Sequence, residues 1–171
     1  MSAPPIPSRL PRVPAGAITL RRAAGADSRD IWKWRNDPDT RAASVDSAPI
    51  LWEQHHHWFS EILERGDRRV HIIEAMNQPV GVTRLDITAG EAAVSIHLAP
   101  EWRGRGVGPV ALDMLADRAF HELRLERLLA SVKADNLASL SAFARASFKE
   151  TNRGGGMVTL ERRRHQAVAA T

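Results

Sequence analysis

The stretch APEWRGRGVGPVALDML, residues 99–115, decides the fold of this chain, because it joins a predicted strand to a predicted helix through three glycines. Without Cβ atoms, the backbone at these glycines can curl so that several N–H groups point to one side. The same N–H groups lie at the start of a helix, where the helix dipole adds positive charge. The loop therefore predicts an anion site suited to phosphate, strengthened by two arginines, Arg103 and Arg105.

The common phosphate-binding loops do not account for this stretch. A P-loop needs Lys-Ser or Lys-Thr after its last glycine, and Pro109 stands there instead. In the dinucleotide-binding pattern G-x-G-x-x-G the third glycine would stand at position 109 rather than 108, and too few residues follow for a doubly wound sheet. The remaining alternative is a tight strand–helix turn without a ligand, which three glycines and two arginines in one turn disfavour.

Hydrophobic periodicity and turn residues assign the rest of the chain around this loop. Strands are predicted at residues 17–23, 68–76, 79–88, 92–100 and 128–132, followed by a hairpin over 147–163. Helices are predicted at 26–37, at 50–66, from Pro109 onward and from Asn136 to about Ala146, with Pro38 ending the first. This order predicts an α/β fold in one domain, whose central sheet is partly antiparallel and partly parallel and is flanked by about four helices.

Length and composition exclude several classes of protein. The 171 residues carry a net charge of +4 and no cysteine, which excludes disulfides and thiolate chemistry. No apolar run is long enough to cross a membrane, so we expect a cytoplasmic protein without a membrane partner. Basic residues are dispersed except at 162–164, so we expect no nucleic acid partner either. We expect a proline-rich flexible leader at 1–15, the domain at 16–162 and a flexible tail at 163–171, with a homodimer left open.

Two stretches carry a resemblance to a known family. The loop 103–108, RGRGVG, resembles the [Q/R]-x-x-G-x-[G/A] signature of the GNAT superfamily of acyl-CoA-dependent N-acetyltransferases. The stretch ADNLASLSAFARASF, residues 134–148, resembles the second half-site of that superfamily through Asn136, Ser139 and Phe148. The resemblance spans roughly residues 17–152 and implies the GNAT fold with acetyl-CoA as co-substrate.

The resemblance also implies which residues bind the coenzyme. The loop would hold the pyrophosphate, and the backbone around Ile96 and Leu98 would contact the pantetheine and the acetyl carbonyl. The coenzyme-binding residues implied in this way are Ile96, Leu98, Arg103, Gly104, Arg105, Gly106, Val107, Gly108, Asn136, Ser139 and Phe143.

The chain departs from the family pattern at two positions. Ser147 stands where the family has glycine, and Phe143 stands where many members have a tyrosine that protonates the leaving thiolate of coenzyme A. The chain contains no tyrosine at all. Water, a hydroxyl of Ser139 or Ser141, or uncatalysed departure of the thiol are the alternatives.

An attacking amine must be neutral, so the reaction needs a proton acceptor. The candidate catalytic bases on the central strands are Glu74 and His97, with Asp86 as a weaker candidate that can instead pair with an arginine. Glu74 alternates with Val70 and Ile72, and burial there would raise its pKa toward neutrality. The alternatives are a solvent-exposed strand end for Glu74 and a packing role for His97.

The first two helices carry a further resemblance. The pattern W-R-N-x(4)-R followed by I-x(4)-H-x-x-W, beginning at Trp34 and at Ile50, resembles the branch that acetylates nucleotide-linked amino sugars, as in pseudaminic acid biosynthesis. Its side chains suit such an acceptor, since tryptophan stacks on bases and sugars and arginine pairs with diphosphate. The implied substrate-binding residues are Trp34, Arg35, Asn36, Arg41, His55 and Trp58.

Several of these residues also have a structural explanation. Trp34 and His55 can belong to the core, and Arg35 can serve a salt bridge. The three consecutive histidines at 55–57 point about 100° apart on a helix, so we expect no metal site.

We therefore predict direct transfer of acetyl from acetyl-CoA to a primary amine in a ternary complex, with a small-molecule amino-sugar nucleotide as acceptor. The alternatives are an acetyltransferase of N-terminal peptides or ribosomal proteins, and a non-catalytic acyl-CoA-binding module.

Overall fold

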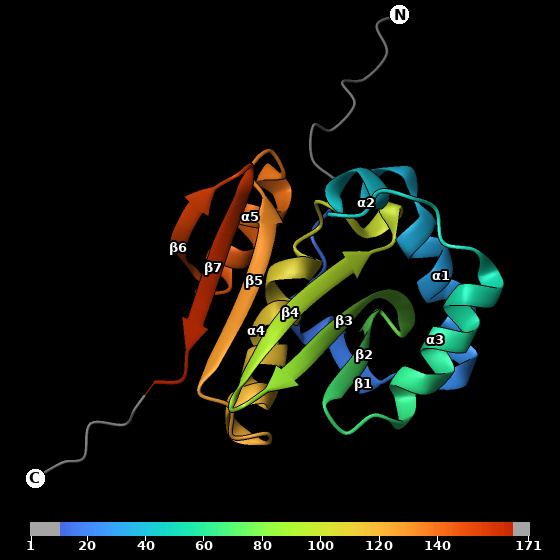
Figure 1. Cartoon of the computed structure of the whole chain (residues 1–171), viewed down its shortest axis with the longest axis horizontal. Helices are drawn as coiled ribbons and strands as arrows, with labels where there is room; N and C mark the ends of the chain where they lie inside the picture. Colours follow the sequence, from blue (N-terminus) through green and yellow to red (C-terminus); the bar gives the residue numbers. More distant parts are fainter. Residues whose placement is uncertain (1–10, 166–171) are drawn as a thin grey trace, which may run out of the picture.

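The computed structural model describes residues 11–165, which form one mixed α/β domain (Figure 1). The seven-stranded sheet has the order β1-β2-β3-β4-β5-β7-β6. Its strands are β1 Ile18–Arg22, β2 Arg68–Ala75, β3 Gln78–Thr88, β4 Glu91–Leu98, β5 Arg127–Lys133, β6 Lys149–Gly154 and β7 Met157–Arg163. The helices are α1 Ser28–Asn36, α2 Pro38–Ala43, α3 Trp52–Glu64, α4 Val107–His121 and α5 Leu137–Arg145. Short 3-10 turns lie at η1 Ala15–Ala17, η2 Gly25–Asp27 and η3 Pro100–Trp102.

The predicted fold class is confirmed, with one additional helix. Pro38 ends α1 as expected, but it also begins α2, because proline is well tolerated at the first helical position. The Asp37 side chain caps this short helix by accepting a hydrogen bond from the backbone N–H of Thr40. Helix α4 begins two residues before Pro109, at Val107, and its N-cap is Gly106.

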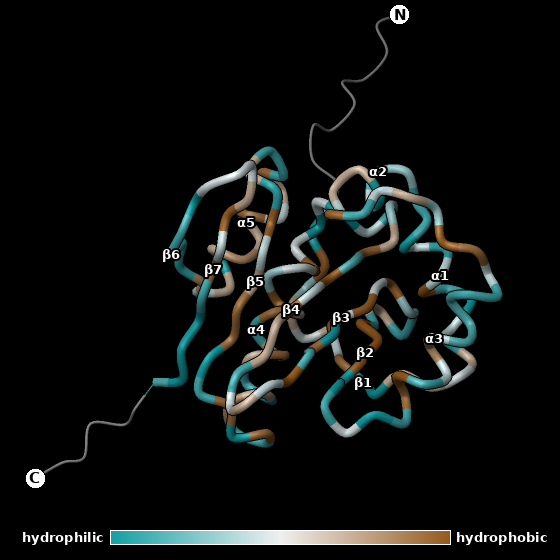
Figure 2. Tube along the Cα trace, in the orientation of Figure 1, coloured by the Kyte–Doolittle hydropathy of each residue, from teal (hydrophilic) through white to brown (hydrophobic). Residues whose placement is uncertain are grey.

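The sheet consists of two antiparallel parts joined by a short parallel contact. Strands β1 to β4 pair antiparallel in sequence, and β5, β7 and β6 form a second antiparallel set. Helix α4 packs behind the sheet against β1, β3 and β4, whereas α1 and α3 cover β2, β3 and β4 from the other side (Figure 1). Apolar residues follow the central strands, while β6 at the edge is polar along its length (Figure 2). The core therefore lies on both faces of β2 to β4, where Ile72, Ile73 and Leu85 are fully buried.

The ends of the described chain pack against the domain. Val13 is buried, and its backbone N–H donates to the Arg105 carbonyl at 3.0 Å. At the other end, the backbone N–H of Arg164 donates to the Glu126 carbonyl at 2.9 Å. Of the predicted leader, residues 11–15 thus lie against the glycine loop, and 1–10 fall outside the described residues. Of the predicted tail, residues 166–171 fall outside them.

Strands β4 and β5 separate soon after they meet. Their parallel register covers only three residue pairs, from Glu91 with Arg127 to Ala93 with Leu129. The backbone N–H of Ala99 bonds to the Val80 carbonyl at 2.9 Å, so alternate residues of β4 bond to β3. By this alternation the peptide groups of Ile96 and Leu98 face the opening that β5 leaves. The fold thereby provides unpaired backbone groups inside its own sheet.

Gly81 lets β3 approach β4 at this opening. It lies opposite Leu98, and a Cβ atom at Gly81 would stand 2.5 Å from the His97 carbonyl oxygen and 2.7 Å from Leu98 Cδ2. Both neighbours are part of the cleft-side strand, so only glycine fits without moving it.

We expect Gly81→Ala to lower the free energy of unfolding by about 1–3 kcal/mol, because the added methyl pushes β3 away from β4. Urea unfolding of the purified variant measures this effect. Gly16→Ala is the matched control, since nothing lies within 4 Å of the place its Cβ would take, and it should change stability by less than about 0.5 kcal/mol. Equal stabilities of the two variants would contradict the close approach.

Candidate active site

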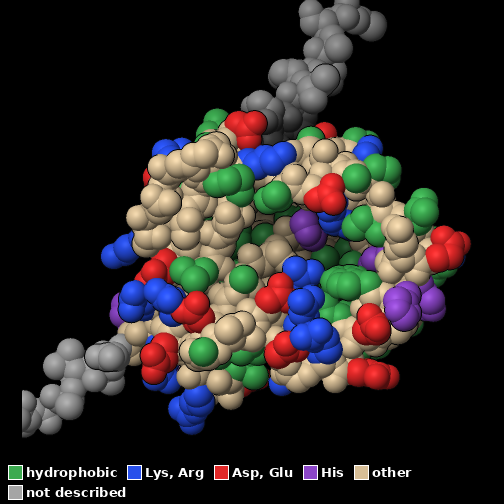
Figure 3. Space-filling view, in the orientation of Figure 1, with side chains coloured by type: hydrophobic (Ala, Val, Ile, Leu, Met, Phe, Trp, Pro, Cys, Tyr) green, Lys and Arg blue, Asp and Glu red, His purple; other side chains and the backbone are tan. Residues whose placement is uncertain are grey.

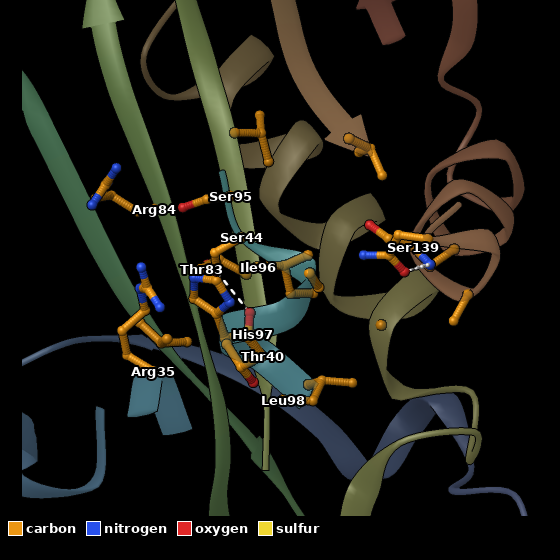
Figure 4. Close-up of a pocket in the computed structure, with 18 of the residues that line it drawn as sticks. Arg35, Thr40, Ser44, Thr83, Arg84, Ser95, Ile96, His97, Leu98 and Ser139 are labelled. Carbon is orange, nitrogen blue, oxygen red and sulfur yellow. Dashed lines mark hydrogen bonds between the residues drawn. The ribbon is translucent and has the colours of Figure 1, made fainter. Parts of the chain in front are cut away.

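A cleft of about 1190 Å³ opens where β4 and β5 diverge. Figure 3 shows this face of the molecule hollowed near its centre, with histidine and basic side chains beside the hollow. The lining comes from β3, β4, β5, the start of α4, helix α5 and the region from α1 to α3. In the close-up, Arg35, Arg84, Ser95 and His97 lie on one side of β4 and Ser139 lies across the cleft (Figure 4). The cleft therefore has two arms that meet at β4. The coenzyme arm contains the glycine loop and α5, and the acceptor arm contains Arg35, Arg84 and His97.

The glycine loop forms the wall of the cleft beneath α4. Gly104 and Gly106 have φ values of 70° and 83°, a left-handed backbone that glycine adopts without strain. Gly106 ends the loop as the N-cap of α4, and the first turn of that helix contains no acidic residue. Gly104, Gly106, Val107 and Gly108 all line the cleft. The unpaired N–H groups of a helix start therefore lie at the cleft wall, as an anion site requires.

The two arginines of the loop both make contacts within the protein. Arg103 lines the cleft, but its guanidinium binds Asp37 at 2.7 Å, Thr40 Oγ1 at 2.8 Å and Asp39 at 3.3 Å. Burial opposes ionisation of Asp37, yet its pKa is lowered, because Arg103 and Thr40 stabilise the carboxylate. Arg103 therefore fastens the loop to α2.

Arg105, which is predicted to bind phosphate, does not line the cleft in this structure. Its Nε donates to the Pro11 carbonyl at 3.2 Å, and its guanidinium lies 4.3 Å from the centre of the Trp102 ring. The aromatic face and the carbonyl oxygen hold the side chain on the outside of the loop. On the cleft side, the loop therefore presents its glycine backbone rather than this side chain.

Helix α5 forms the opposite wall. Asn136 caps it by accepting a hydrogen bond from the Ser139 backbone N–H at 3.1 Å, and both residues line the cleft. Phe143 is 2% exposed, lines the cleft and packs edge-on against Phe148 at 5.0 Å. Ser141 lines the cleft too, and so does Ser131 of β5, which sequence reasoning missed. Several hydroxyls therefore surround the site where the family's tyrosine is absent.

His97 lies in the cleft on the face of β4 that carries Ser95 and, across to β3, Arg84. Burial lowers the pKa of its imidazole to about 4, and the charges of Arg35, Arg84 and Arg103 add to the shift. The imidazole is therefore neutral near pH 7 and able to accept a proton, although its surroundings make it a weak base.

The structure does not bring Glu74, a predicted base, into the cleft. Its Oε1 accepts a hydrogen bond from Arg21 Nε at 2.8 Å, and Arg21 binds Asp27 at 2.7 Å. The register between β2 and β3 shifts at this point, from Ile73 opposite Gly81 to Glu74 opposite Pro79. Asp86 is paired as well, with Arg84 at 2.9 Å and Arg68 at 3.3 Å. His97 is the predicted base that lies in the cleft.

Three residues of the predicted acceptor motif bind the backbone of the loop 44–51 between α2 and α3. Asn36 forms two bonds with Ile50, from Nδ2 to the carbonyl at 2.9 Å and from the Ile50 N–H to Oδ1 at 2.8 Å. Arg35 Nη2 donates to the Asp46 carbonyl at 2.8 Å, and Arg41 Nη1 donates to the Ser47 carbonyl at 3.3 Å. Asn36 and Arg41, which are predicted to bind the substrate, do not line the cleft and instead hold this loop in place.

Arg35 alone of these three reaches the cleft. Its Nη1 is buried and has no hydrogen-bond partner within residues 11–165. Burial lowers the pKa of Arg35, which Asp46 opposes and Arg41 and Arg84 reinforce. A buried guanidinium N–H without a partner at a cleft wall is a ready contact for an anionic group.

The aromatic residues divide between core and cleft. Trp34, a predicted substrate contact that could also belong to the core, is 8% exposed, packs in the core and does not line the cleft. His55 lines the cleft but is 3% exposed, and its Nε2 donates to the Ser28 carbonyl at 2.9 Å. Burial lowers the pKa of His55, and its ring stacks on Phe59. Trp58 lines the cleft with the Arg84 guanidinium 5.6 Å from the centre of its ring.

The lining of the cleft is strongly basic. Sequence reasoning missed Arg84 and Ser95, although the pairing of strands 79–88 and 92–100 across one tight turn places them opposite each other. Against two aspartates, Asp39 and Asp46, six arginines line the cleft: Arg12, Arg35, Arg68, Arg84, Arg103 and Arg145.

No helix within residues 11–165 combines the length and apolar character that a bilayer crossing needs.

We expect the free energy of unfolding to fall by about 2 kcal/mol per histidine between pH 7 and pH 5 for His71 and His97. Both have a pKa lowered from 6.5 to about 4, so the unfolded chain binds more protons in this window and stability is lost as the pH falls. Urea unfolding at both pH values measures the loss. His71→Phe and His97→Phe should each remove about half of it, and an unchanged loss in both variants would contradict the burial argument.

Similarity to known proteins extends over most of the chain. Residues 17–149 match the model of the acetyltransferase (GNAT) domain. An acetyltransferase named PseH from Campylobacter jejuni is 25% identical over 135 residues, which cover 77% of this chain and 84% of that protein.

Two solved structures share the fold. The spermidine N-acetyltransferase of Vibrio cholerae, in complex with CoA and spermine, has a TM-score of 0.76 at 17% identity and covers 85% of this chain and 94% of its own. AAC(6')-Ib, in complex with paromomycin and acetyl-CoA, has a TM-score of 0.76 at 14% identity over 86% and 94%. At these identities the likeness concerns the fold alone. Because the family model matches most of the chain, this protein belongs to the GNAT family and is an acetyltransferase.

Proposed function

We propose that this acetyltransferase transfers acetyl from acetyl-CoA to the primary amine of an anionic small molecule, and that an amino-sugar nucleotide is the acceptor. The observation that carries the proposal is the basic cleft, with six arginines against two aspartates. Part of this charge suits the coenzyme, but Arg35 and Arg84 lie on the acceptor side of β4, beside His97 (Figure 4). Their position favours an acceptor that carries phosphate.

The coenzyme arm fits the glycine loop and the open edge of β4. The first-turn N–H groups of α4 and the left-handed Gly104 and Gly106 suit a pyrophosphate. The peptide groups of Ile96 and Leu98 face the opening and have no strand beside them, which suits an extended pantetheine. A backbone N–H there also supplies the donor that stabilises the oxyanion formed when the amine attacks the thioester.

The acceptor arm fits an anion with an aromatic or sugar face. The unpaired Nη1 of Arg35 supplies a buried donor, and Trp58 supplies an aromatic surface in the cleft wall. The similarity to the acetyltransferase named PseH supports the same class of acceptor. The resemblance of the pattern in residues 34–58 to amino-sugar acetyltransferases supports it as well. A polyamine such as the spermine in the Vibrio structure would meet like charges here, which cost binding free energy.

His97 is the proposed proton acceptor. Its neutral imidazole lies between Arg35 and Arg84, whose charges contribute to its lowered pKa. An acceptor phosphate at these arginines offsets their field, so the bound acceptor makes His97 a stronger base. Transfer is direct, because the chain has no cysteine to carry an acyl group.

A panel of acceptors tests the proposal with the wild-type protein. We expect release of free thiol from acetyl-CoA with a nucleotide-linked 4-amino sugar, and at least tenfold lower kcat/KM with N-terminal peptides or spermidine. Thiol release is followed with a chromogenic disulfide reagent. If peptides were the preferred substrates, the proposed class of acceptor would be wrong. If coenzyme A bound but no amine in the panel were acetylated, the proposed reaction would be contradicted.

A charge-inserting pair of variants tests the coenzyme loop. We expect Gly106→Glu to weaken coenzyme A binding by at least tenfold, because a carboxylate would stand among the helix N–H groups that suit the pyrophosphate. Gly90→Glu is the matched control, since Gly90 has φ of 84° against 83° for Gly106 and both have open space at Cβ. Calorimetric titration of both variants measures the affinities. Wild-type affinity in Gly106→Glu would remove the loop as the pyrophosphate site.

A further inference from the structure

The segment 11–14, with the sequence PRVP, is fastened to the glycine loop through Arg105. Val13 is 6% exposed, and its backbone N–H donates to the Arg105 carbonyl at 3.0 Å. In the opposite direction, Arg105 Nε donates to the Pro11 carbonyl at 3.2 Å. Arg105 therefore exchanges two hydrogen bonds with this segment, one through its backbone and one through its side chain.

Two prolines limit the conformations of this short segment. Pro11 and Pro14 each restrict their own φ to about −65°, and Pro14 also favours an extended conformation for Val13 before it. Pro14 has φ of −58° and ψ of 139°, and the chain continues from it into η1. A backbone with few accessible conformations loses little entropy when it is fixed. The two hydrogen bonds and the buried valine therefore hold the segment beside the loop at a small entropic cost.

The segment brings Arg12 to the cleft. Arg12 belongs to the cleft lining together with Gly104 and Gly106 of the loop. The nitrogen of the next residue, Val13, lies 3.0 Å from the Arg105 carbonyl oxygen. Standard bond lengths then place the Cα atom of Arg12 within about 6 Å of that oxygen. The Arg12 side chain therefore starts directly beside the glycine loop and extends into the space that the loop borders.

The two arginines of the loop itself are already engaged. Arg103 is paired with Asp37 and Asp39, whereas no ion pair within residues 11–165 includes Arg12. Arg105 is held by the segment and by the face of Trp102, and it does not line the cleft. A guanidinium without a carboxylate partner can pair with two phosphate oxygens at once. The charge that the loop's arginines do not offer to an anion is therefore available from Arg12.

We propose that Arg12 binds a phosphate group of coenzyme A, and that Arg105 is the positioning residue that holds the segment 11–14 in place for this contact. The inference rests on the proposed function, because it takes the glycine loop to be the site of the coenzyme's phosphates. The loop supplies backbone N–H groups, and the segment before β1 supplies the charged side chain. The ordered end of the proline-rich stretch is thus part of the coenzyme site.

Calorimetric titration of Arg12→Ala with coenzyme A and with 3′-dephospho-coenzyme A tests the contact. We expect the affinity for coenzyme A to fall about fivefold to tenfold at low ionic strength, because one charge-assisted contact with phosphate is lost. An equal loss with both ligands assigns the contact to the pyrophosphate. A loss confined to coenzyme A assigns it to the 3′-phosphate. Wild-type affinity for both ligands would overturn the proposal.

Arg164→Ala is the matched control for the loss of one positive charge. Arg164 lines the small pocket beside α4 and β7 instead of the cleft, and no ion pair within residues 11–165 includes it. Its affinity for coenzyme A should stay within about twofold of the wild type, because salt screens charges outside the site. Neither arginine is buried, so both variants should keep the urea midpoint of the wild type. An equal loss of affinity in both variants would contradict a specific contact.

A double-mutant cycle separates positioning from direct contact. Arg105→Ala removes the bond to the Pro11 carbonyl, so the segment loosens and Arg12 is less well placed. We expect this variant to bind coenzyme A about threefold more weakly than the wild type, and the double variant with Arg12→Ala to bind no more weakly than Arg12→Ala alone. Losses that multiply in the double variant would show that Arg105 acts independently of Arg12, and would overturn its positioning role.

The Gly106→Glu variant distinguishes a failure of this inference from a failure of the proposed function. If Gly106→Glu loses coenzyme A binding while Arg12→Ala retains it, the loop remains the phosphate site and only the role of Arg12 is wrong. If both variants bind coenzyme A as the wild type does, the loop is not the site, and the proposed coenzyme arm fails together with this inference.

Discussion

The separation of β5 from β4 is the constraint on which the site depends. A sheet normally satisfies the backbone groups of each inner strand on both sides. Here β4 has lost its neighbour beyond Ala93, while β3 continues to hold it in register as far as Leu98. The resulting edge lies within the molecule, is closely approached by Gly81 on its other side, and can be completed only by a ligand with its own donors and acceptors. The glycine loop and α5 form two walls of the cleft that contains this edge.

In the acceptor half of the cleft, side chains form hydrogen bonds with the backbone of the loop 44–51 and so fix its position. The loop 44–51 contributes no strand or helix, yet Arg35, Asn36 and Arg41 each bind one of its carbonyl groups. Trp32 adds a fourth bond, from its indole N–H to the Ile50 carbonyl at 2.8 Å. The motif that resembles amino-sugar acetyltransferases therefore acts largely by shaping the wall, and of these side chains only Arg35 also presents an unpaired N–H to the cleft. Arg103 similarly ties α2 to the coenzyme loop.

The sequence predicts those features that local physics determines. Three glycines before a helix specify a loop conformation without reference to the rest of the chain, and the strand order follows from turns and periodicity. The sequence does not predict which group a charged side chain binds, because that group lies far away along the chain. Glu74 finds Arg21, which lies 53 positions earlier, and Arg105 finds Pro11, which lies 94 positions earlier. Hydrophobic periodicity predicts on which face of its strand or helix a side chain lies, but it does not predict which distant arginine or carbonyl group binds that side chain.

Phe143 stands where many family members have tyrosine, and the chain has no tyrosine at any other position either. This composition determines which side chains fluoresce. With five tryptophans and no tyrosine, all near-ultraviolet emission excited near 280 nm comes from indole rings. Trp58 lies in the cleft wall beneath Arg84, and Trp102 lies beneath Arg105 at the edge of the glycine loop. One indole thus lies in the wall of the cleft and a second lies on the outer side of the glycine loop, so the unlabelled protein can report ligand binding through its own fluorescence.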